Sequence, residues 1–109
     1  MAAERIDVVT AHEMWRAGDT VIDVRTADEY ARGHIAGALN VPIGLLAYTA
    51  GELPDGPIIT TCTYGGRASR AAELLDLAGR TAFSIAGGTK AWQAAGLPVR
   101  SGLEPGKRR

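Results

Sequence analysis

Short apolar segments alternate with amphipathic segments along the whole chain. Residues 69–78 place apolar side chains at the spacing of one helix face, which predicts an amphipathic helix. Five other segments are apolar, are bounded by turn residues and are predicted to be strands: residues 6–9, 21–25, 38–41, 58–61 and 82–85. Strands that alternate with helices in this way predict a parallel sheet covered on both faces.

Capping signals place the shorter helices. The pairs Thr10/Glu13 and Thr26/Glu29, in which a glutamate follows a threonine after three residues, predict helix starts at Thr10 and Thr26. We therefore expect short helices over residues 11–17 and 27–32. Another short helix is expected over residues 43–48, and a last one after two consecutive glycines near the end of the chain.

Length and charge narrow the class of protein. The 109 residues are enough for one domain, which we expect to span residues 1–109 with a flexible tail over about residues 103–109. The 12 basic and 12 acidic residues cancel, which argues against nucleic acid as a partner. No stretch resembles a membrane span or a signal peptide, so we expect a cytoplasmic protein that makes no membrane contact.

The chain contains a single cysteine. It therefore cannot form an internal disulfide, and a lone thiol fits a reducing compartment. No group of histidines, cysteines and carboxylates has the spacing of zinc ligands. We expect neither a metal nor a cofactor.

The candidate chemistry lies where the strand over residues 58–61 ends. In open α/β sheets, ligands bind beyond the carboxyl ends of the strands. The residues at this point, between the predicted strand and the predicted helix, are Cys62, Thr63, Tyr64, Gly65, Gly66 and Arg67.

This stretch favours a small anion-binding cup with a nucleophile at its base. Gly65 and Gly66 can adopt positive φ, which lets successive N–H groups point inward. The following helix N-terminus and the cation of Arg67 favour the thiolate form of Cys62. The structural alternatives are a small buried cysteine, an ordinary tight turn and a solvated arginine. His34 could approach the thiol, but a structural, hydrogen-bonded histidine is the more common case.

Three blocks of sequence, in a fixed order, carry a resemblance to a known family. Residues 21–42 read VIDVRTADEYARGHIAGALNVP, residues 62–67 form the glycine-rich loop, and residues 87–98 read GGTKAWQAAGLP. Together they resemble the first signature, the active loop and the C-terminal signature of single-domain rhodaneses, a family of sulfurtransferases. The resemblance implies a rhodanese-like three-layer sandwich, with a five-stranded parallel sheet between two layers of helices.

The resemblance also implies transfer of sulfane sulfur. The Cys62 thiolate would attack the outer sulfur of thiosulfate or of a persulfide, and a cyanide, a small thiol or a protein thiol would then accept the sulfur. Arg67 would hold the anionic donor, and Asp23 and Arg25 would brace the site. The cradle for the Cys62 persulfide and its substrate would be formed by Thr63, Tyr64, Gly65, Gly66 and Arg67.

Loop length separates this interpretation from related chemistry. Four residues lie between Cys62 and Arg67, whereas phosphatases and arsenate reductases of related fold have five, which makes room for a larger oxyanion. Two alternatives remain open. The first is a Cys-dependent phosphatase or arsenate reductase, and the second is a sulfur-carrier or binding module without turnover. Ala68 stands where the family often has serine, and Tyr64 either packs the loop or shapes donor choice. Because no second cysteine can resolve a persulfide internally, an outside acceptor must discharge it.

Overall fold

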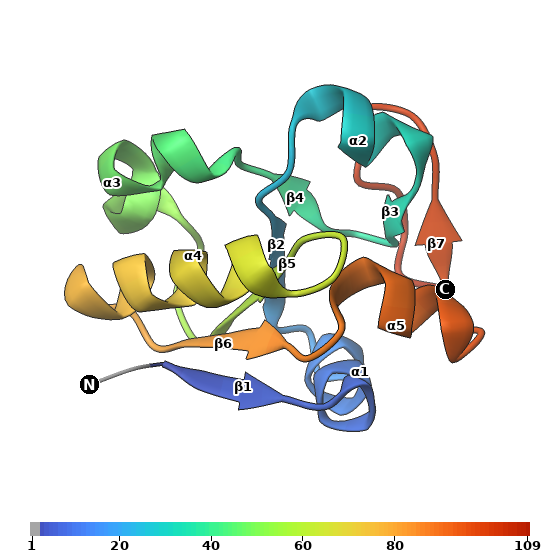
Figure 1. Ribbon diagram of the computed structural model, residues 1–109, viewed down its shortest axis with the longest axis horizontal. Helices are drawn as coiled ribbons and strands as arrows, with labels where there is room; N and C mark the ends of the chain where they lie inside the picture. The colour runs from blue at the N-terminus through green and yellow to red at the C-terminus, as the bar shows by residue number, and fades with distance from the viewer. Residues whose placement is uncertain (1–2) are drawn as a thin grey trace.

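A five-stranded parallel sheet forms the centre of the protein (Figure 1). The computed structural model describes residues 3–109, so the predicted domain boundary at residue 1 lies outside the described residues. The strands pair in the order β1-β6-β5-β2-β4. Their bounds are β1 Glu4–Ile6, β2 Thr20–Asp23, β4 Leu39–Asn40, β5 Ile58–Thr61 and β6 Ala82–Ile85.

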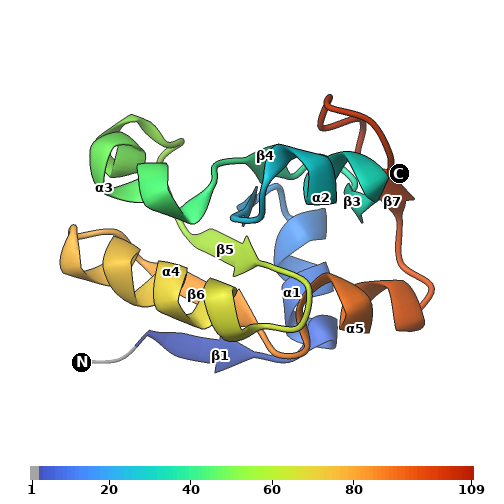
Figure 2. The same cartoon turned by 45° about the horizontal axis from the view of Figure 1, so that its top comes forward.

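Helices cover both faces of this sheet, as the views in Figures 1 and 2 show. One face carries α3 and α4, with the short 3-10 turns η1 and η2 on either side of α3; the other carries α1, α2 and α5. The bounds are α1 Val8–Arg16, α2 Ala27–Arg32, η1 Ile43–Leu45, α3 Leu46–Thr49, η2 Ala50–Glu52, α4 Gly66–Leu77 and α5 Gly88–Ala94. The predicted fold class is confirmed.

Alternation along the central strands divides the core into two clusters. Ile22 and Ile58 pack toward α3 and α4, while their neighbours Val21 and Ile59 pack toward α1, α2 and α5. All four side chains are at most 1% exposed. Strands that are buried on both faces read as continuous apolar runs, and this is why the sequence pattern located β2, β5 and β6 within two residues.

The first strand and helix begin earlier than the sequence pattern predicts. Residues 6–9 were predicted to form a strand and Thr10 to cap the helix, but β1 ends at Ile6 and α1 begins at Val8. The carboxylate of Asp7 accepts the backbone N–H of Thr10 at 2.8 Å and so acts as the N-cap. An aspartate is as good a cap as a threonine, and here it lies at the end of the strand. The capping box of Thr26 with Glu29 at the start of α2 is confirmed.

The C-terminal segment returns to the body of the domain. β7 (Val99–Arg100) pairs antiparallel with β3 (His34–Ile35), a two-stranded sheet that the sequence pattern did not indicate. Within residues 103–109, the carbonyl of Pro105 accepts the N–H of Gly37 at 2.8 Å. The guanidinium of Arg108 donates to the carbonyl of Trp15 at 2.8 Å and lies 5.9 Å from that indole ring.

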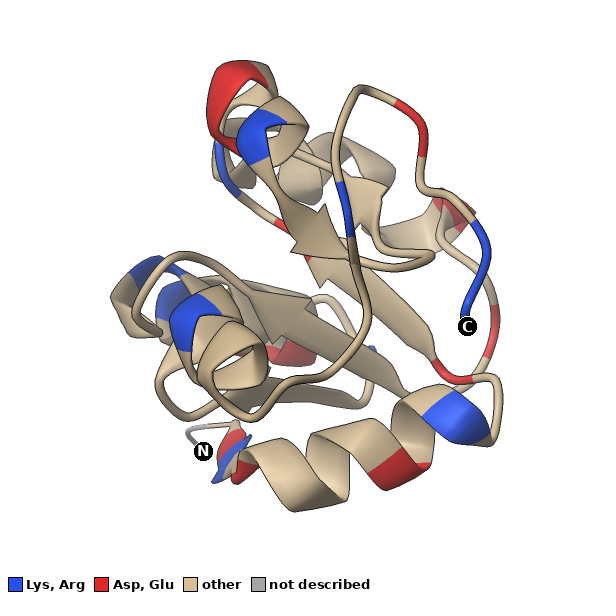
Figure 3. Cartoon of the chain, turned by 90° about the vertical axis from the view of Figure 1, so that its right-hand side faces the viewer, with Lys and Arg blue, Asp and Glu red and all other residues tan. Residues whose placement is uncertain are grey.

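Charged residues of both signs are interspersed over the surface. In Figure 3, α1 at the bottom and α2 at the top each carry acidic and basic residues. This distribution agrees with the zero formal net charge of the chain. Among the described residues, no helix combines the length and the apolar character that crossing a bilayer requires.

Candidate active site

The loop after β5 wraps around the thiol of Cys62. The side chain is only 2% exposed, and its Sγ accepts two backbone N–H groups, from Gly65 at 3.0 Å and from Ala68 at 3.3 Å. Backbone N–H groups directed at sulfur stabilise negative charge on it, as they do for other anions at helix N-termini. The loop and the first turn of α4 therefore form a cradle around the sulfur atom.

The two loop glycines play different parts. Gly65 has φ +112° and precedes α4 as its N-cap, so it makes the turn that a side chain would hinder. Gly66 is already the first residue of α4 and does not have positive φ, so of the two glycines only Gly65 uses this conformational freedom. Because α4 begins three residues before the predicted start at Ser69, its positive end lies directly at the thiol.

Several loop N–H groups are free for a ligand. Within residues 3–109, the N–H groups of Thr63, Tyr64, Gly66 and Arg67 have no hydrogen-bond acceptor. Free N–H groups beside a helix N-terminus can hold a compact anion. Tyr64 itself projects outward and is 74% exposed.

The start of α5 is docked onto the same loop. The N–H of Thr89 donates to the carbonyl of Cys62 at 2.7 Å, and the N–H of Lys90 donates to the carbonyl of Thr63 at 3.1 Å. Gly88 has φ +61°, and a Cβ at this position would lie 2.6 Å from the carbonyl oxygen of Cys62. This close approach of two backbones explains why the chain needs glycine at position 88.

Asp23 and Arg25 form a buried ion pair at the carboxyl end of β2. The guanidinium of Arg25 reaches both carboxylate oxygens, with Nη2 at 2.7 Å from Oδ2, and Nη2 also donates to the carbonyl of Gly33 at 2.7 Å. Asp23 is fully buried and the Arg25 side chain is 8% exposed. Burial and the nearby Asp23 charge raise the pKa of Tyr30 to about 12. Through these contacts Arg25 links the carboxyl end of β2 to the residue that follows α2.

Arg67 is held by Glu29 of α2. The two side chains form two parallel hydrogen bonds, Nη1 to Oε1 at 2.8 Å and Nη2 to Oε2 at 2.9 Å. The hydrogen bonds from Arg67 lower the pKa of Glu29 to about 2, against the opposing effect of burial. The same contact, with a smaller contribution from the charge of Cys62, raises the pKa of Arg67. Arg67 therefore lies at the loop, with its guanidinium turned to a carboxylate.

Ala68 and His34 are both enclosed by structural partners. Ala68 is fully buried, and its carbonyl accepts the hydroxyl of Thr60 at 2.8 Å. His34 stacks on Tyr30 with ring centroids 3.7 Å apart, and its ring nitrogens face the carbonyls of Tyr30 and Pro105. The imidazole thus has the structural role that the sequence favoured.

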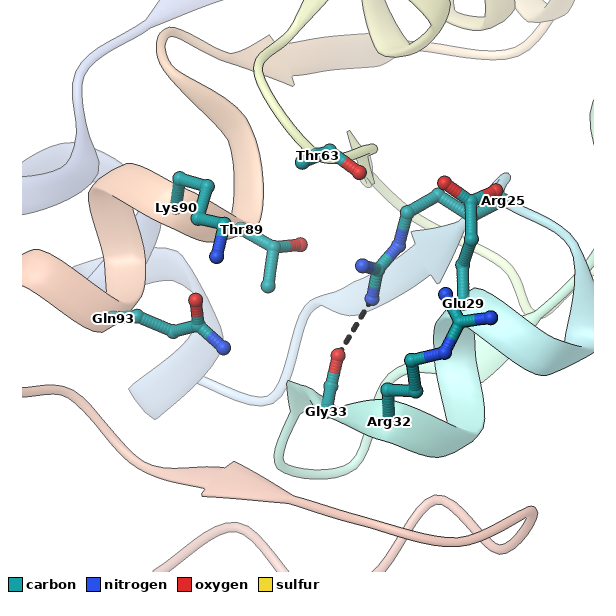
Figure 4. Close-up of a pocket in the computed structure, with 8 residues that line it drawn as sticks. All are labelled: Arg25, Glu29, Arg32, Gly33, Thr63, Thr89, Lys90 and Gln93. Carbon is teal, nitrogen blue, oxygen red and sulfur yellow. Dashed lines mark hydrogen bonds between the residues drawn. The ribbon is translucent and has the colours of Figure 1, made fainter.

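A pocket of about 300 Å³ opens beside the loop, between α2 and α5 (Figure 4). Sequence reasoning did not identify most of its lining, because the lining residues come from three segments that are far apart in the chain. The only local sequence signal for this part of the lining was the pair of glycines before α5, which marks the start of a helix. The lining residues are Arg25, Glu29, Arg32, Gly33, Thr63, Thr89, Lys90 and Gln93.

Comparisons with known proteins place the chain in a family. The profile of the Rhodanese-like domain matches residues 8–95, and the chain belongs to this family. It is 36% identical over 110 residues to thiosulfate sulfurtransferase 16, chloroplastic, of Arabidopsis thaliana, covering 88% of this chain and 92% of that protein. A rhodanese-related protein of Thermoplasma volcanium superimposes with a TM-score of 0.82 and 32% identity, covering 93% of this chain and 99% of that one.

A second relative has a different overall architecture. The chain is 39% identical over 107 residues to an HTH-type transcriptional regulator of Mycobacterium tuberculosis. The match covers 92% of this chain but 47% of the regulator, so the chain spans about half the length of that relative. Members of this family thus include both a protein named as a sulfurtransferase and a protein named as a regulator.

Proposed function

We propose that the protein is a sulfurtransferase that carries sulfane sulfur on Cys62. The observation that carries this proposal is the pair of N–H groups, from Gly65 and Ala68, directed at the buried Sγ. Such donors stabilise the thiolate before the reaction and the charged persulfide after it. The relative named thiosulfate sulfurtransferase 16 supports thiosulfate as the donor.

The first half of the reaction loads the thiol. The Cys62 thiolate attacks the outer sulfur of thiosulfate, a new S–S bond forms, and the bond between the two thiosulfate sulfurs breaks. Sulfite leaves with the electron pair of that bond. The free N–H groups of Thr63, Tyr64, Gly66 and Arg67 are available to hold the anionic donor and then the terminal persulfide sulfur.

The second half discharges the persulfide. An acceptor thiolate attacks the outer sulfur of the Cys62 persulfide, the bond to Sγ breaks, and Cys62 returns as a thiolate. Arg67 assists by moving its guanidinium between Glu29 and the bound anion, since both lie at the loop. Asp23 and Arg25 act as positioning residues that support the loop from β2.

Intact mass spectrometry tests this proposal directly. After incubation with thiosulfate, the protein should gain one sulfur atom, and later addition of cyanide should remove it and yield thiocyanate. Cys62→Ser should show neither event, and because Cys62 is the only cysteine, no other thiol can carry the adduct. The absence of an adduct with thiosulfate and with organic persulfides would falsify the proposal.

The same protein preparation distinguishes sulfur transfer from the activity of the alternative enzyme class. A Cys-dependent phosphatase or arsenate reductase would turn over an aryl phosphate or arsenate faster than it transfers sulfur. The four-residue spacing between Cys62 and Arg67 leaves less room for a tetrahedral oxyanion, so we expect sulfur transfer to dominate.

A further inference from the structure

A second pocket lies away from the active loop, where the end of α1 meets the C-terminal segment. Its volume is about 400 Å³, within the range of pockets that hold organic ligands. In Figure 3 the last turn of α1, at the bottom right, lies beside the C-terminal end of the chain. The lining of this pocket shares no residue with the active loop or with the pocket beside that loop. The reaction proposed for Cys62 therefore makes no use of it.

The lining of this second pocket carries positive charge without a countercharge. Three of the lining residues are arginines, Arg16, Arg108 and Arg109, and none of the described lining residues is acidic. Within residues 3–109, none of the three arginines forms an ion pair. Because the formal net charge of the whole chain is zero, these cations make the pocket a local site of positive charge.

Arg108 is the cation whose position is fixed best. Its Nη1 donates to the carbonyl of Trp15 at 2.8 Å, and its stem packs on Gly37, where a Cβ would lie 2.7 Å from Cγ. The residue is half-buried, and burial lowers its pKa, while the charge of Asp19 opposes this without forming an ion pair. In the part of the chain that the structure describes, Nε and Nη2 have no acceptor, so they are available to an anion.

Rings form most of the remaining lining. His12 is half-buried and stacks on Trp15 with ring centroids 5.5 Å apart, and the ring of Pro98 lies at the same pocket. Gly18 leaves the pocket open, since a Cβ at this position would meet no atom within 4 Å. Imidazole rings and guanidinium planes stack on the flat rings of bases. The pocket therefore combines ring surface with three cations.

We infer that this pocket binds a nucleoside phosphate, a ligand in which a flat heteroaromatic ring is joined to a group with two or three negative charges. The ring stacks on His12 and Pro98, and the phosphate groups bind the guanidinium groups of Arg16 and Arg108. A single carboxylate would neutralise only one of the three cations, and an inorganic anion would leave the rings uncovered. A ring that carries phosphate uses both parts of the lining. This binding is independent of the proposed sulfur transfer.

Titration with ADP and with its two parts tests the inference. The full chain is titrated by calorimetry with ADP, adenosine and pyrophosphate, without divalent cations and at one ionic strength, because salt screens exposed charges. ADP should bind about 5- to 150-fold more tightly than pyrophosphate, the range expected for stacking of one base. It should bind about 3- to 150-fold more tightly than adenosine, the range for three partly exposed charge contacts.

Tryptophan fluorescence gives a second readout that does not depend on sulfur transfer. The chain has two tryptophans; Trp15 lines the pocket and Trp92 packs edge to face against it at 5.5 Å. ADP should therefore change the tryptophan emission, with the same affinity as in calorimetry. An emission that stays constant while ADP binds would place the nucleotide elsewhere and overturn the inference.

Variants locate the binding in this pocket. Arg16 is exposed and its side chain makes no hydrogen bond or ion pair within residues 3–109, so Arg16→Gln should leave the fold intact. It should weaken ADP about 1.5- to 5-fold, and addition of Arg108→Gln should bring the loss to about 2- to 30-fold, with adenosine unaffected. Arg70→Gln is the matched control, since it removes an exposed charge from α4 on the other face of the sheet. It should leave the ADP affinity unchanged.

A third variant excludes the active loop as the binding site. Arg67→Gln removes the cation of that loop and should not change the ADP affinity; a loss as large as that of Arg16→Gln would place the phosphates at the loop and overturn the inference. The inference also fails if ADP binds no more tightly than adenosine or pyrophosphate, or if benzoate, a ring with one carboxylate, binds more tightly than ADP. None of these results bears on the loading of Cys62 by thiosulfate, which is measured separately by mass.

Discussion

Replacement of Gly88 by alanine tests the close contact between α5 and the active loop. The residue has φ +61°, which L-residues with a Cβ adopt at a cost of about 1–2 kcal/mol. The new Cβ would also lie 2.6 Å from the carbonyl oxygen of Cys62 and 2.8 Å from that of Thr63. Both are backbone atoms that cannot rotate away, and overpacking of this kind costs about 1–3 kcal/mol. We therefore expect Gly88→Ala to lower the free energy of unfolding by about 2–5 kcal/mol.

A matched control isolates the contact from the backbone conformation. Gly79 has φ +86°, and a Cβ there would meet no atom within 4 Å. Gly79→Ala should therefore cost only the conformational part, about 1–2 kcal/mol. Urea unfolding at 25 °C followed by tryptophan fluorescence gives both values, with equal m-values if the unfolded states are alike.

The active loop provides a second readout. Relief of the clash must displace the carbonyls of Cys62 and Thr63, so Gly88→Ala should also slow loading by thiosulfate under conditions where the variant is fully folded. Gly79→Ala, beyond the far end of α4, should load at the normal rate. Equal losses of stability in the two variants, within about 0.5 kcal/mol, would refute the reasoning.

Two further changes test the ion pairs at the site. Asp23→Asn leaves the buried Arg25 without a countercharge and should lower the free energy of unfolding by about 3–5 kcal/mol in urea titrations; a loss near zero would show that the pair is not needed. The pKa of Glu29 is about 2 instead of 4.5, so its pair with Arg67 stabilises the fold fully above about pH 4.5 and is lost as the pH falls toward 2. Glu29→Gln should remove this part of the decrease in the free energy of unfolding at acid pH. The part is at most about 1 kcal/mol for a partly exposed pair, and it is measured as the difference in the free energy of unfolding between pH 5 and pH 3. The same variant frees Arg67 for an anion and should lower the KM for thiosulfate; a raised KM would mean that Glu29 mainly positions the arginine.

Local signals in the sequence located most of the elements. β5 and β6 were predicted with their observed bounds because strands buried on both faces consist of apolar, β-branched runs. The capping box at Thr26 marked α2 because its partners are three residues apart. The error at α1 has the same origin, since Asp7 and Thr10 are both good caps and only the folded chain shows which one is used.

The features of the candidate site likewise divide into those that the sequence could predict and those that depend on the fold. Cys62, the glycine turn and Arg67 are neighbours in the chain, so their type and spacing were sufficient to predict an anion cup that contains a nucleophile. The partner of Arg67 was not accessible to such reasoning, because Glu29 is 38 residues away and reaches it only when α2 folds over the loop. The pocket depends likewise on α2 and α5, which are far apart in the chain and come together only because the fold places both on the same face of the sheet.

The sequence by itself thus determined the order of strands and helices, the position of the thiol and the chemistry that its neighbours favour. These properties follow from periodicity, capping and residue type over a few consecutive positions. Only the tertiary structure decided which carboxylate holds Arg67 and which two helices line the pocket beside the loop. Each of these depends on contacts between segments that are distant in the chain, and such contacts form only when the sheet brings the segments together.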